Sequence, residues 1–286
     1  MSSNKVLVVL IIIVISCSRK KEKCSHIDLH NHSKKDYVIN TDAGNTDDGK
    51  FCQNIPPKLK RKTIDITNKA LENIKDNHYA LMNDCMIGVK VDDIDITCIK
   101  DAFILPPITL GKSLSDEDEN PDITINQIVK ANYHQMFFGN KESGKTVLLY
   151  RLVREFADEY QYTRRIPIYF NLDEIGNKEI ETVLKEYLSF NSNELKNLIE
   201  NNDIVLLVDN LNYKDTGENI ERIKKLEAFI DNYSNVKVIA TGDGDISTGV
   251  PPIDYIEYCK IAFKSLFIQN LRSKEIKSII KLWIPD

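Results

Sequence analysis

Eight consecutive residues near the middle of the chain constrain its fold more than any other feature. They run from Gly139 to Thr146 and read G-N-K-E-S-G-K-T, which fits the Walker A pattern G-x-x-x-x-G-K-[ST]. Glycines at both ends let the backbone curl, so that its N–H groups and the positive end of a following helix form an anion site. The lysine adds a charge for phosphate groups, and the threonine hydroxyl can ligate Mg²⁺. The pattern therefore predicts a phosphate loop.

The segments on either side of this loop have the character that the loop requires. Residues 133–138 are aromatic-rich and strand-like. Residues 147–156 repeat apolar side chains at helical spacing. Strand, glycine loop and helix form the expected context, so we expect ATP or ADP to bind here, with Lys145 in a catalytic role. The predicted cofactor-binding residues of the loop are Gly139, Asn140, Lys141, Glu142, Ser143, Gly144, Lys145 and Thr146.

Strands and helices alternate along the rest of the chain. We expect strands over 166–171, 204–208 and 236–241, and helices over 178–189, 194–201 (with Asn193 as N-cap), 219–232 and 273–282. The continuous apolar run 204–208 is typical of a central strand in a covered parallel sheet. The predicted fold class is therefore α/β: a P-loop NTPase three-layer sandwich with a mostly parallel sheet. A small irregular or α+β N-terminal region, with a helix near 63–82 and strands within 86–105, precedes it.

Asp209 follows the apolar run 204–208 directly and is the expected partner of the phosphate loop. A Mg²⁺–triphosphate site needs a carboxylate at the carboxyl end of a neighbouring strand. We therefore predict Thr146 and Asp209 as metal ligands, with Asp209 as a second catalytic residue. Thr241 ends the next strand and is predicted to contact the γ-phosphate. The expected cofactors are ATP or ADP with Mg²⁺, because no guanine-specifying N-K-x-D is recognisable.

The sequence leaves hydrolysis open. Many P-loop ATPases carry an acidic residue shortly after the metal aspartate, but here the run is Asp209-Asn210-Leu211-Asn212-Tyr213. Asn212 could orient a water molecule but cannot take its proton. Asp215 and Glu218 are nearby in sequence, in a loop that leaves their positions open. The arginines that could stabilise transition-state charge are interpreted as helix-surface residues: Arg151, Arg154, Arg164 and Arg165.

Composition and charge bound the class of protein. The 286 residues are 42% hydrophobic and 28% charged, as in globular proteins, and the net charge is −5. This balance shows no footprint for nucleic acid, so no such partner is expected. The six cysteines form no C-x-x-C pair, which favours a reduced compartment. We expect a signal or anchor segment over 1–17, a polar linker over 18–60, a connecting region over 61–120 and the P-loop NTPase domain over 121–286.

The amino terminus carries a wholly apolar stretch, residues 6–15, between Lys5 and the basic run 19–23. It is short for a membrane span, which needs about 20 residues, and its length fits a secretory signal. The ending V-I-S-C at Cys17 also resembles a bacterial lipoprotein cleavage box. A buried strand and a misplaced gene start remain alternatives. Because the basic run favours the cytoplasmic side, we expect membrane attachment through residues 6–17 with a cytoplasmic NTPase domain; the alternative is a lipoprotein lipidated at Cys17.

Four segments together resemble a known family: 137–149, 166–169, 205–209 and 238–241. They are similar to the STAND class of P-loop NTPases, in particular its bacterial NACHT-like members, and the resemblance covers residues 90–286. It implies a signalling switch that exchanges ADP for ATP and then self-associates or acts with a separate sensor or effector chain, often in bacterial defence. Members continue into a winged-helix domain and a repeat sensor, so the resemblance implies that this chain is a fragment or a split gene product.

Two positions depart from the family pattern. The family often has D-G-x-D-E after the strand where this chain has Asp209-Asn210-Leu211-Asn212-Tyr213, and T-S-R where it has Thr241-Gly242-Asp243. Both departures predict slow or impaired hydrolysis. A non-catalytic nucleotide-binding membrane lipoprotein or scaffold therefore stays open as an alternative. A P-loop small-molecule kinase is a further one, although residues 246–266 offer lysines and no arginine-rich lid.

Overall fold

The computed structural model describes residues 64–77, 90–91, 94–95, 103–110, 122–212, 217–252 and 259–283. The apolar stretch 6–15 and Cys17 lie outside these ranges. All described residues belong to one compact unit, Thr63–Asp286. Among the helices in the described ranges, none combines the length and the apolar character that crossing a bilayer requires.

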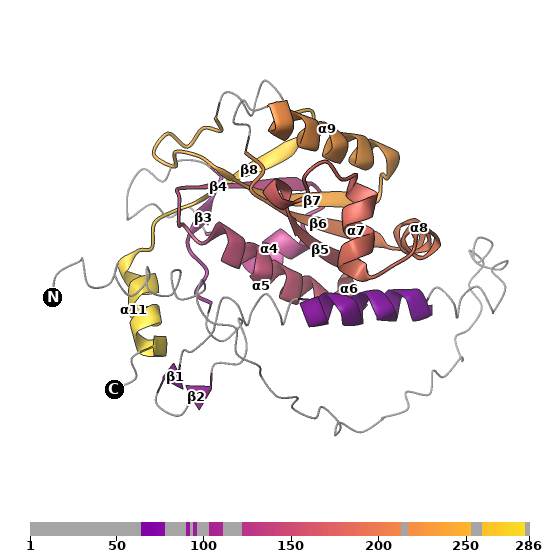
Figure 1. The fold of residues 1–286 in the computed structure, drawn as a ribbon. Helices are drawn as coiled ribbons and strands as arrows, with labels where there is room; N and C mark the ends of the chain where they lie inside the picture. The colour runs from indigo at the N-terminus through magenta and orange to yellow at the C-terminus, as the bar shows by residue number, and fades with distance from the viewer. Residues whose placement is uncertain are drawn as a thin grey trace, which may run out of the picture. The chain divides into compact units, whose positions relative to one another are not determined.

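A six-stranded sheet forms the centre of the unit, in the order β3-β8-β4-β7-β6-β5. Its strands are β3 (Ile108–Thr109), β4 (His134–Gly139), β5 (Arg165–Asn171), β6 (Asp203–Asp209), β7 (Val236–Asp243) and β8 (Phe263–Ile268). Only β3 runs antiparallel to its neighbour among these described strands, which confirms the predicted mostly parallel sheet. Strand β7 lies between β4 and β6, so one strand separates the phosphate loop from Asp209 (Figure 1).

Helices lie on both faces of this sheet, as the predicted three-layer sandwich requires. Helix α5 (Lys145–Asp158) covers one face and α9 (Gly217–Asn232) the other (Figure 1). Helix α7 (Ile180–Leu188) contacts both α8 (Ser192–Asn201) and α9. The remaining elements are α4 (Ile125–Lys130), α6 (Tyr160–Thr163), η1 (Leu172–Glu174), α11 (Ser273–Trp283) and a small antiparallel pair, β1 (Lys90–Val91) with β2 (Ile94–Asp95).

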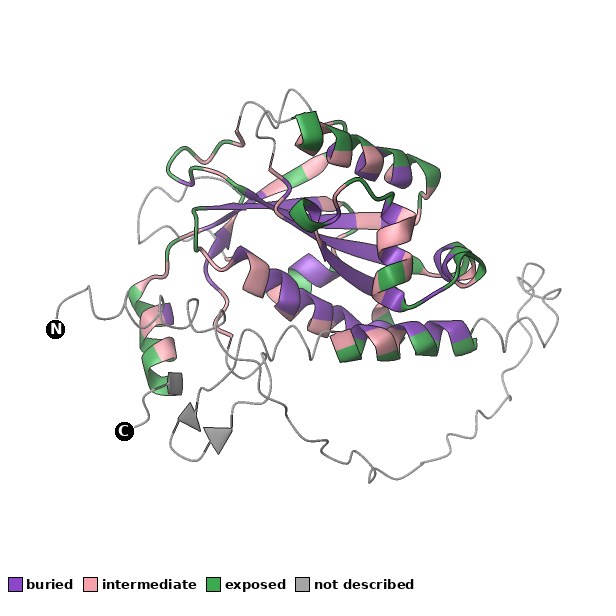
Figure 2. Ribbon diagram, viewed as in Figure 1, coloured by how far each residue is buried: buried purple, intermediate pink, exposed green. Residues whose placement is uncertain are grey.

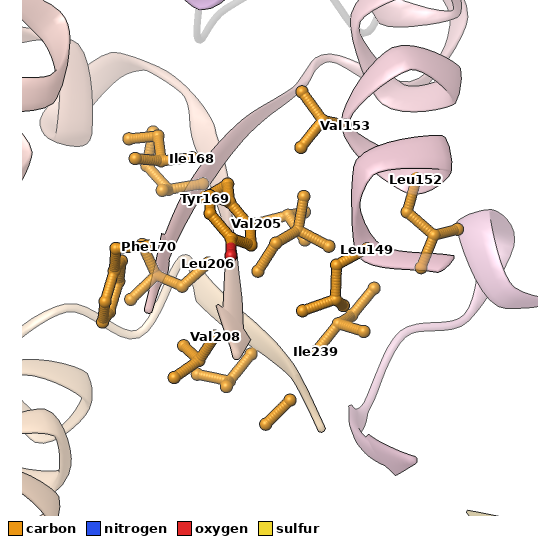
Figure 3. Close-up of a cluster of buried hydrophobic side chains, with 14 of the residues drawn as sticks. Leu149, Leu152, Val153, Ile168, Tyr169, Phe170, Val205, Leu206, Val208 and Ile239 are labelled. Atoms are coloured by element: carbon orange, nitrogen blue, oxygen red, sulfur yellow. The ribbon is translucent and has the colours of Figure 1, made fainter. Parts of the chain in front are cut away.

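The core forms where the central strands meet the inner faces of the helices (Figure 2). Residues Ile204 to Asp209 of β6 are all buried, which explains the unbroken apolar run in the sequence, since both faces of this strand are covered. Leu149 of α5 lies against the strand residues Val205 and Ile239 (Figure 3). This packing holds α5, and with it the phosphate loop, against the strand that ends in Asp209.

Helix 64–77 is also part of this unit. Its Lys69 Nζ lies 2.8 Å from Glu194 Oε1 of α8, and its Asn77 Nδ2 donates to the carbonyl of Tyr187 at 2.6 Å. Ile74 on the same helix is fully buried. These contacts attach the helix to the α7–α8 side of the unit. The boundaries at residues 17, 60 and 120 stay predictions.

The N-cap of α8 differs from the sequence prediction. Asn191, and not Asn193, caps the helix: its side chain accepts from the backbone N–H groups of Asn193 and Glu194, each at 3.0 Å. Glu194 Oε2 accepts from the backbone N–H of Asn191 at 2.9 Å, which completes a capping box. The prediction of Asn193 is therefore wrong. Asn193 lies inside the first turn of α8, and its own backbone N–H is one of the free groups that the side chain of Asn191 satisfies.

Candidate nucleotide-binding site

The predicted phosphate loop is a tight turn between β4 and α5. Gly139 ends the strand, and a side chain at this position would collide with the Ser143 hydroxyl. Gly144 precedes α5 with φ of 85°, a left-handed conformation that glycine adopts without strain. Glu142 also has positive φ, at 65°, and the N–H of Ser143 donates to the carbonyl of Asn140 at 3.2 Å. The two glycines thus allow the curl that the pattern predicts.

The amino end of α5 presents positive charge to this loop. The helix has fourteen residues, its first turn contains no acidic side chain, and Gly144 cannot cap it with a side chain. Its free N–H groups and dipole are therefore available to an anion. The hydroxyl of Ser143, within the curl, is buried and has no hydrogen-bond partner among the described residues. A buried polar atom without a partner is unfavourable, so a polar ligand in the loop would satisfy it.

Lys145 lies at the centre of the loop and is only 9% exposed. Its ammonium donates to the carbonyl oxygens of Gly139, at 3.0 Å, and Asn140, at 2.8 Å. It also forms an ion pair with Asp243 Oδ1 at 3.1 Å. An ammonium has three N–H donors, so three oxygens now occupy the group that would contact phosphates. Asp243 is not among the site residues that the sequence predicts.

Asp209 meets Thr146 at the carboxyl end of β6. The Thr146 hydroxyl donates to Asp209 Oδ2 at 2.6 Å, although 63 positions separate the two residues. Asp209 is only 2% exposed, and three further donors hold its carboxylate. These are the Thr241 hydroxyl, the backbone N–H of Asn210 at 3.1 Å and the Tyr169 hydroxyl at 3.4 Å. A buried carboxylate needs such donors, so its position is fixed.

These two oxygen-bearing groups fit Mg²⁺. A threonine hydroxyl and a carboxylate are hard oxygen donors, and Thr146 and Asp209 supply them side by side. No cluster of three or more His, Cys, Asp or Glu side chains suited to a metal occurs in the described ranges. Mg²⁺ commonly takes one or two protein oxygens and completes its shell with water and substrate phosphates. The donor set at Thr146 and Asp209 is of this kind.

Two residues behind Asp209 have identifiable supporting roles. Thr241, predicted to contact the γ-phosphate, is fully buried, and its hydroxyl donates a hydrogen bond to Asp209 Oδ1. Burial raises the pKa of the Tyr169 hydroxyl well above its ordinary range, and the negative charge of Asp209 raises it further. Tyr169 therefore stays a neutral donor at physiological pH. Its ring stacks edge-on against Tyr150, with centroids 4.9 Å apart, which fixes its orientation.

The chain turns sharply after β6 and brings Asn212 to the end of β7. Asn210 has φ of 58°, in the left-handed region that asparagine tolerates. The N–H of Leu211 donates to the carbonyl of Thr241 at 2.8 Å, and the N–H of Asp243 donates to Asn212 Oδ1 at 2.7 Å. Asn212, which could orient water, thus lies beside Asp243.

The remaining candidates for hydrolysis are placed elsewhere or not described. Glu218, in the first turn of α9, lies 3.4 Å from Arg222, and Asp215 lies outside the described residues. The arginines have structural partners: Arg151 pairs with Glu155 and Arg154 with Asp158, each at 2.9 Å, Arg164 lies over the ring of Tyr160, and Arg165 Nη1 donates to the carbonyl of Ala131 at 2.8 Å. Arg165 begins β5 and so is not on a helix surface.

Comparisons with known proteins return partial structural matches. A scan of protein-family models finds no match, and a search of curated proteins finds none either. Among solved structures, AMPPCP-bound DnaA from Aquifex aeolicus matches with a TM-score of 0.37 and 21% identity over 57% of this chain and 50% of that one. The ORC1 protein of Aeropyrum pernix in complex with DNA matches at 0.36 and 12%, over 58% and 51%. C. elegans PCH-2 matches at 0.32 and 14%, over 55% and 40%.

This chain therefore spans about half the length of the first two of these structures, and less of the third. The class of protein follows from the chain itself. A glycine loop leads from the parallel strand β4 into α5, and Asp209 meets this loop from a strand two places along the sheet. The chain has the fold of a P-loop NTPase.

Proposed function

We propose that the chain binds ATP or ADP with Mg²⁺ in the loop 139–146 and acts as a nucleotide-dependent switch. The observation that carries this proposal is the hydrogen bond between Thr146 and Asp209. It joins the loop to a buried carboxylate at the carboxyl end of β6. Ligation of one Mg²⁺ would give a role to both groups, because a hydroxyl and a carboxylate beside a phosphate loop are suitable ligands for this ion.

Each group of the site has a part in binding. The N–H groups at the start of α5 and around the curl face the phosphates, and the Ser143 hydroxyl adds a donor. Lys145 exchanges its contacts with Gly139, Asn140 and Asp243 for phosphate oxygens. Mg²⁺, when bound to Thr146 and Asp209, would neutralise phosphate charge. Thr241 and Tyr169 keep the Asp209 carboxylate in place.

The finer assignment, a STAND switch of the NACHT-like kind, is supported by the resemblance of the four sequence segments. Such a switch exchanges ADP for ATP and then self-associates or acts on a separate sensor or effector chain, for example in bacterial defence. Slow hydrolysis suits this role, because the ATP-bound state must last long enough to signal. The absence of a glutamate in the run Asp209–Asn212 supports slow turnover. Attachment to the membrane through residues 6–17, with the NTPase domain in the cytoplasm, completes the proposal.

A non-catalytic nucleotide-binding scaffold is the second candidate. The run after Asp209, with asparagines where an acid is usual, favours it. A binding-only protein would hold ATP without turnover. A switch transfers the γ-phosphoryl group of ATP to water, whereas a small-molecule kinase would transfer it to a metabolite. Measuring the fate of the γ-phosphate over hours therefore separates these functions.

Equilibrium binding of ATP and ADP, with and without Mg²⁺, tests the shared core of the proposal. Lys145→Ala removes the ammonium at the loop centre, so we expect nucleotide affinity to fall at least ~10-fold, since hydrogen bonds to charged groups contribute about 1.5–3 kcal/mol. Lys196→Ala, on the exposed surface of α8, is the matched control and should bind as the wild type does. Equal affinity of the Lys145 variant and the wild type would reject the proposed site.

A further inference from the structure

A carboxylate lies directly on the lysine of the phosphate loop. Asp243 is the last residue of β7, and its Oδ1 is 3.1 Å from Lys145 Nζ. Its side chain is 46% exposed, so water reaches it, in contrast to the buried Asp209. Because the loop lysine contacts the β- and γ-phosphates, a carboxylate beside its ammonium lies at the terminal-phosphate end of the loop.

The sheet holds the backbone of Asp243 in this position. Strand β7 pairs in parallel with β4, and the register sets Asp243 opposite Gly139, the first residue of the loop. The N–H of the next residue, Gly244, donates to the carbonyl of Gly139 at 3.4 Å. The N–H of Asp243 donates to Asn212 Oδ1 at 2.7 Å. Asp243 is thus tied both to the phosphate loop and to the segment after β6.

The residue before Asp243 makes this close approach possible. A Cβ on Gly242 would lie 2.9 Å from the carbonyl oxygen of Leu211 and 2.5 Å from Met136 Cε. The backbone carbonyl cannot move away cheaply, so a side chain here would push β7 from the segment 210–212. Glycine at this position lets Asp243 and Asn212 lie together at the loop.

We infer that Asp243 is the catalytic base of a slow ATP hydrolysis, in place of the glutamate that the sequence lacks after Asp209. The inference rests on the proposed function. The Asp243 carboxylate is exposed to water and lies 3.1 Å from the loop lysine, so it is near the place where this lysine would hold the γ-phosphate and where a base is needed. When ATP enters, Lys145 turns to the phosphates, and the ion pair that now occupies the Asp243 carboxylate is broken.

The reaction balances with water as the only co-reactant besides ATP. The water oxygen forms a bond to the γ-phosphorus, and the bond from that phosphorus to the β–γ bridging oxygen breaks. The electron pair stays on the bridging oxygen of ADP. The proton of the water passes to the Asp243 carboxylate and then to the phosphate product. The side-chain oxygen of Asn212 accepts a hydrogen bond from the backbone N–H of Asp243. This contact places the amide group of Asn212 beside Asp243, where it can orient the water.

Asp243→Asn tests this role, because the amide has the same shape but cannot take a proton. We expect the rate of phosphate release at saturating ATP to fall ~100-fold or more, which is the usual contribution of a general base. Affinity for ATP, measured separately by fluorescence of a labelled nucleotide, should be unchanged or tighter, since a negative charge beside the phosphates is removed. Asp243→Glu restores a carboxylate and should recover part of the rate.

Asp245→Asn is the matched control. It removes the same charge two residues further along the chain and keeps an oxygen for the N–H of Ser247, which now donates to Asp245 Oδ1 at 2.8 Å. It should turn over as the wild type does. The inference is overturned if Asp243→Asn keeps the wild-type rate, if it loses ATP affinity in step with the rate, or if the wild type binds ATP without any turnover. A wild type that binds no nucleotide would instead remove the proposed function itself.

Discussion

The Thr146 hydroxyl donates a hydrogen bond of 2.6 Å to the Asp209 carboxylate, and this contact crosses from the first turn of α5 to the end of β6. It spans the position of β7, which lies between the two parent strands in the sheet. The Thr241 hydroxyl fills that gap, because it donates to the other oxygen of the same carboxylate. The Asp209 carboxylate at the end of β6 thus joins the first turn of α5 to β7.

Removing either of the two proposed Mg²⁺ ligands should remove the Mg²⁺ dependence of nucleotide binding. For Thr146→Ala and Asp209→Asn we expect affinity in the presence of Mg²⁺ to fall to the value that the wild type shows with a chelator, because Mg²⁺ loses a ligand. Titration calorimetry with and without Mg²⁺ measures both values. Thr146→Ser keeps the hydroxyl and should keep the Mg²⁺ effect. A Mg²⁺ effect of wild-type size in Thr146→Ala would count against this metal site.

Thr241→Val should weaken the metal site without touching it. Valine has nearly the same shape, but the Asp209 carboxylate loses a buried donor. Residues that hydrogen-bond to metal ligands typically contribute 10–100-fold to metal affinity. We therefore expect the Mg²⁺ concentration needed for half-maximal ATP binding to rise by about that factor. Thr241→Ser restores the donor and serves as the control. If valine and serine behaved alike, Thr241 would have no such supporting role.

Gly242→Ala should destabilise the fold. The new methyl would lie 2.9 Å from the carbonyl oxygen of Leu211, and relieving this overlap costs about 1–3 kcal/mol. Urea unfolding followed by circular dichroism measures the change. Gly217→Ala, at the start of α9, is the control and should be close to neutral, because no atom of the described residues lies within 4 Å of the new Cβ. Equal stability of the two variants would mean that β7 can shift away from residue 211 at little cost.

The ionic cluster at the start of α11 should make stability depend on acid pH. Burial alone would raise the pKa of Asp122, but hydrogen bonds from Arg272 and Lys274 outweigh it and hold this pKa below its ordinary value. Burial likewise acts to raise the pKa of Glu275, and the hydrogen bond from Arg272 reverses it. Carboxyl groups with lowered folded pKa values stabilise the protein above their unfolded pKa, near 4, and lose this contribution as pH falls through the folded value.

Arg272→Gln measures this contribution. The difference in urea midpoint between this variant and the wild type should be largest near pH 7 and should shrink as the pH falls from about 4 through the lowered pKa values of Asp122 and Glu275 in the folded protein. Lys277→Gln, on the same helix, controls for the loss of one positive charge. A difference for Arg272→Gln that stays constant across this range would show that the cluster does not depend on ionised carboxylates.

Local patterns in the sequence were enough to predict much of the fold. The loop pattern and its flanking periodicities predicted the strand–loop–helix unit, and the apolar run 204–208 with its terminal aspartate predicted a buried strand ending in Asp209. These features depend on neighbouring residues, which is why they could be read directly. The N-cap of α8 could have been read as well, because Glu194 stands three residues after Asn191, as a capping box requires.

Features that depend on strand pairing could not be read in this way. Strand β8, Phe263–Ile268, was not predicted, because Lys264 and Ser265 interrupt its apolar character, yet it pairs with β4 at the centre of the sheet. Asp243 looked like a departure from a family pattern. Only the register of β7 against β4 places it opposite Gly139 and so beside Lys145. Register is set by contacts between distant parts of the chain, and the sequence pattern around residue 243 carries no local sign of it.

A structure of the chain with a non-hydrolysable ATP analogue and Mn²⁺ tests the central claim most directly. The anomalous signal of Mn²⁺ locates the metal independently of the phosphates. We expect that signal between the Thr146 hydroxyl and the Asp209 carboxylate, with Lys145 moved from Asp243 to the phosphate oxygens. A metal elsewhere, or an empty loop with Lys145 still on the carbonyls of Gly139 and Asn140 at saturating analogue, would contradict the account.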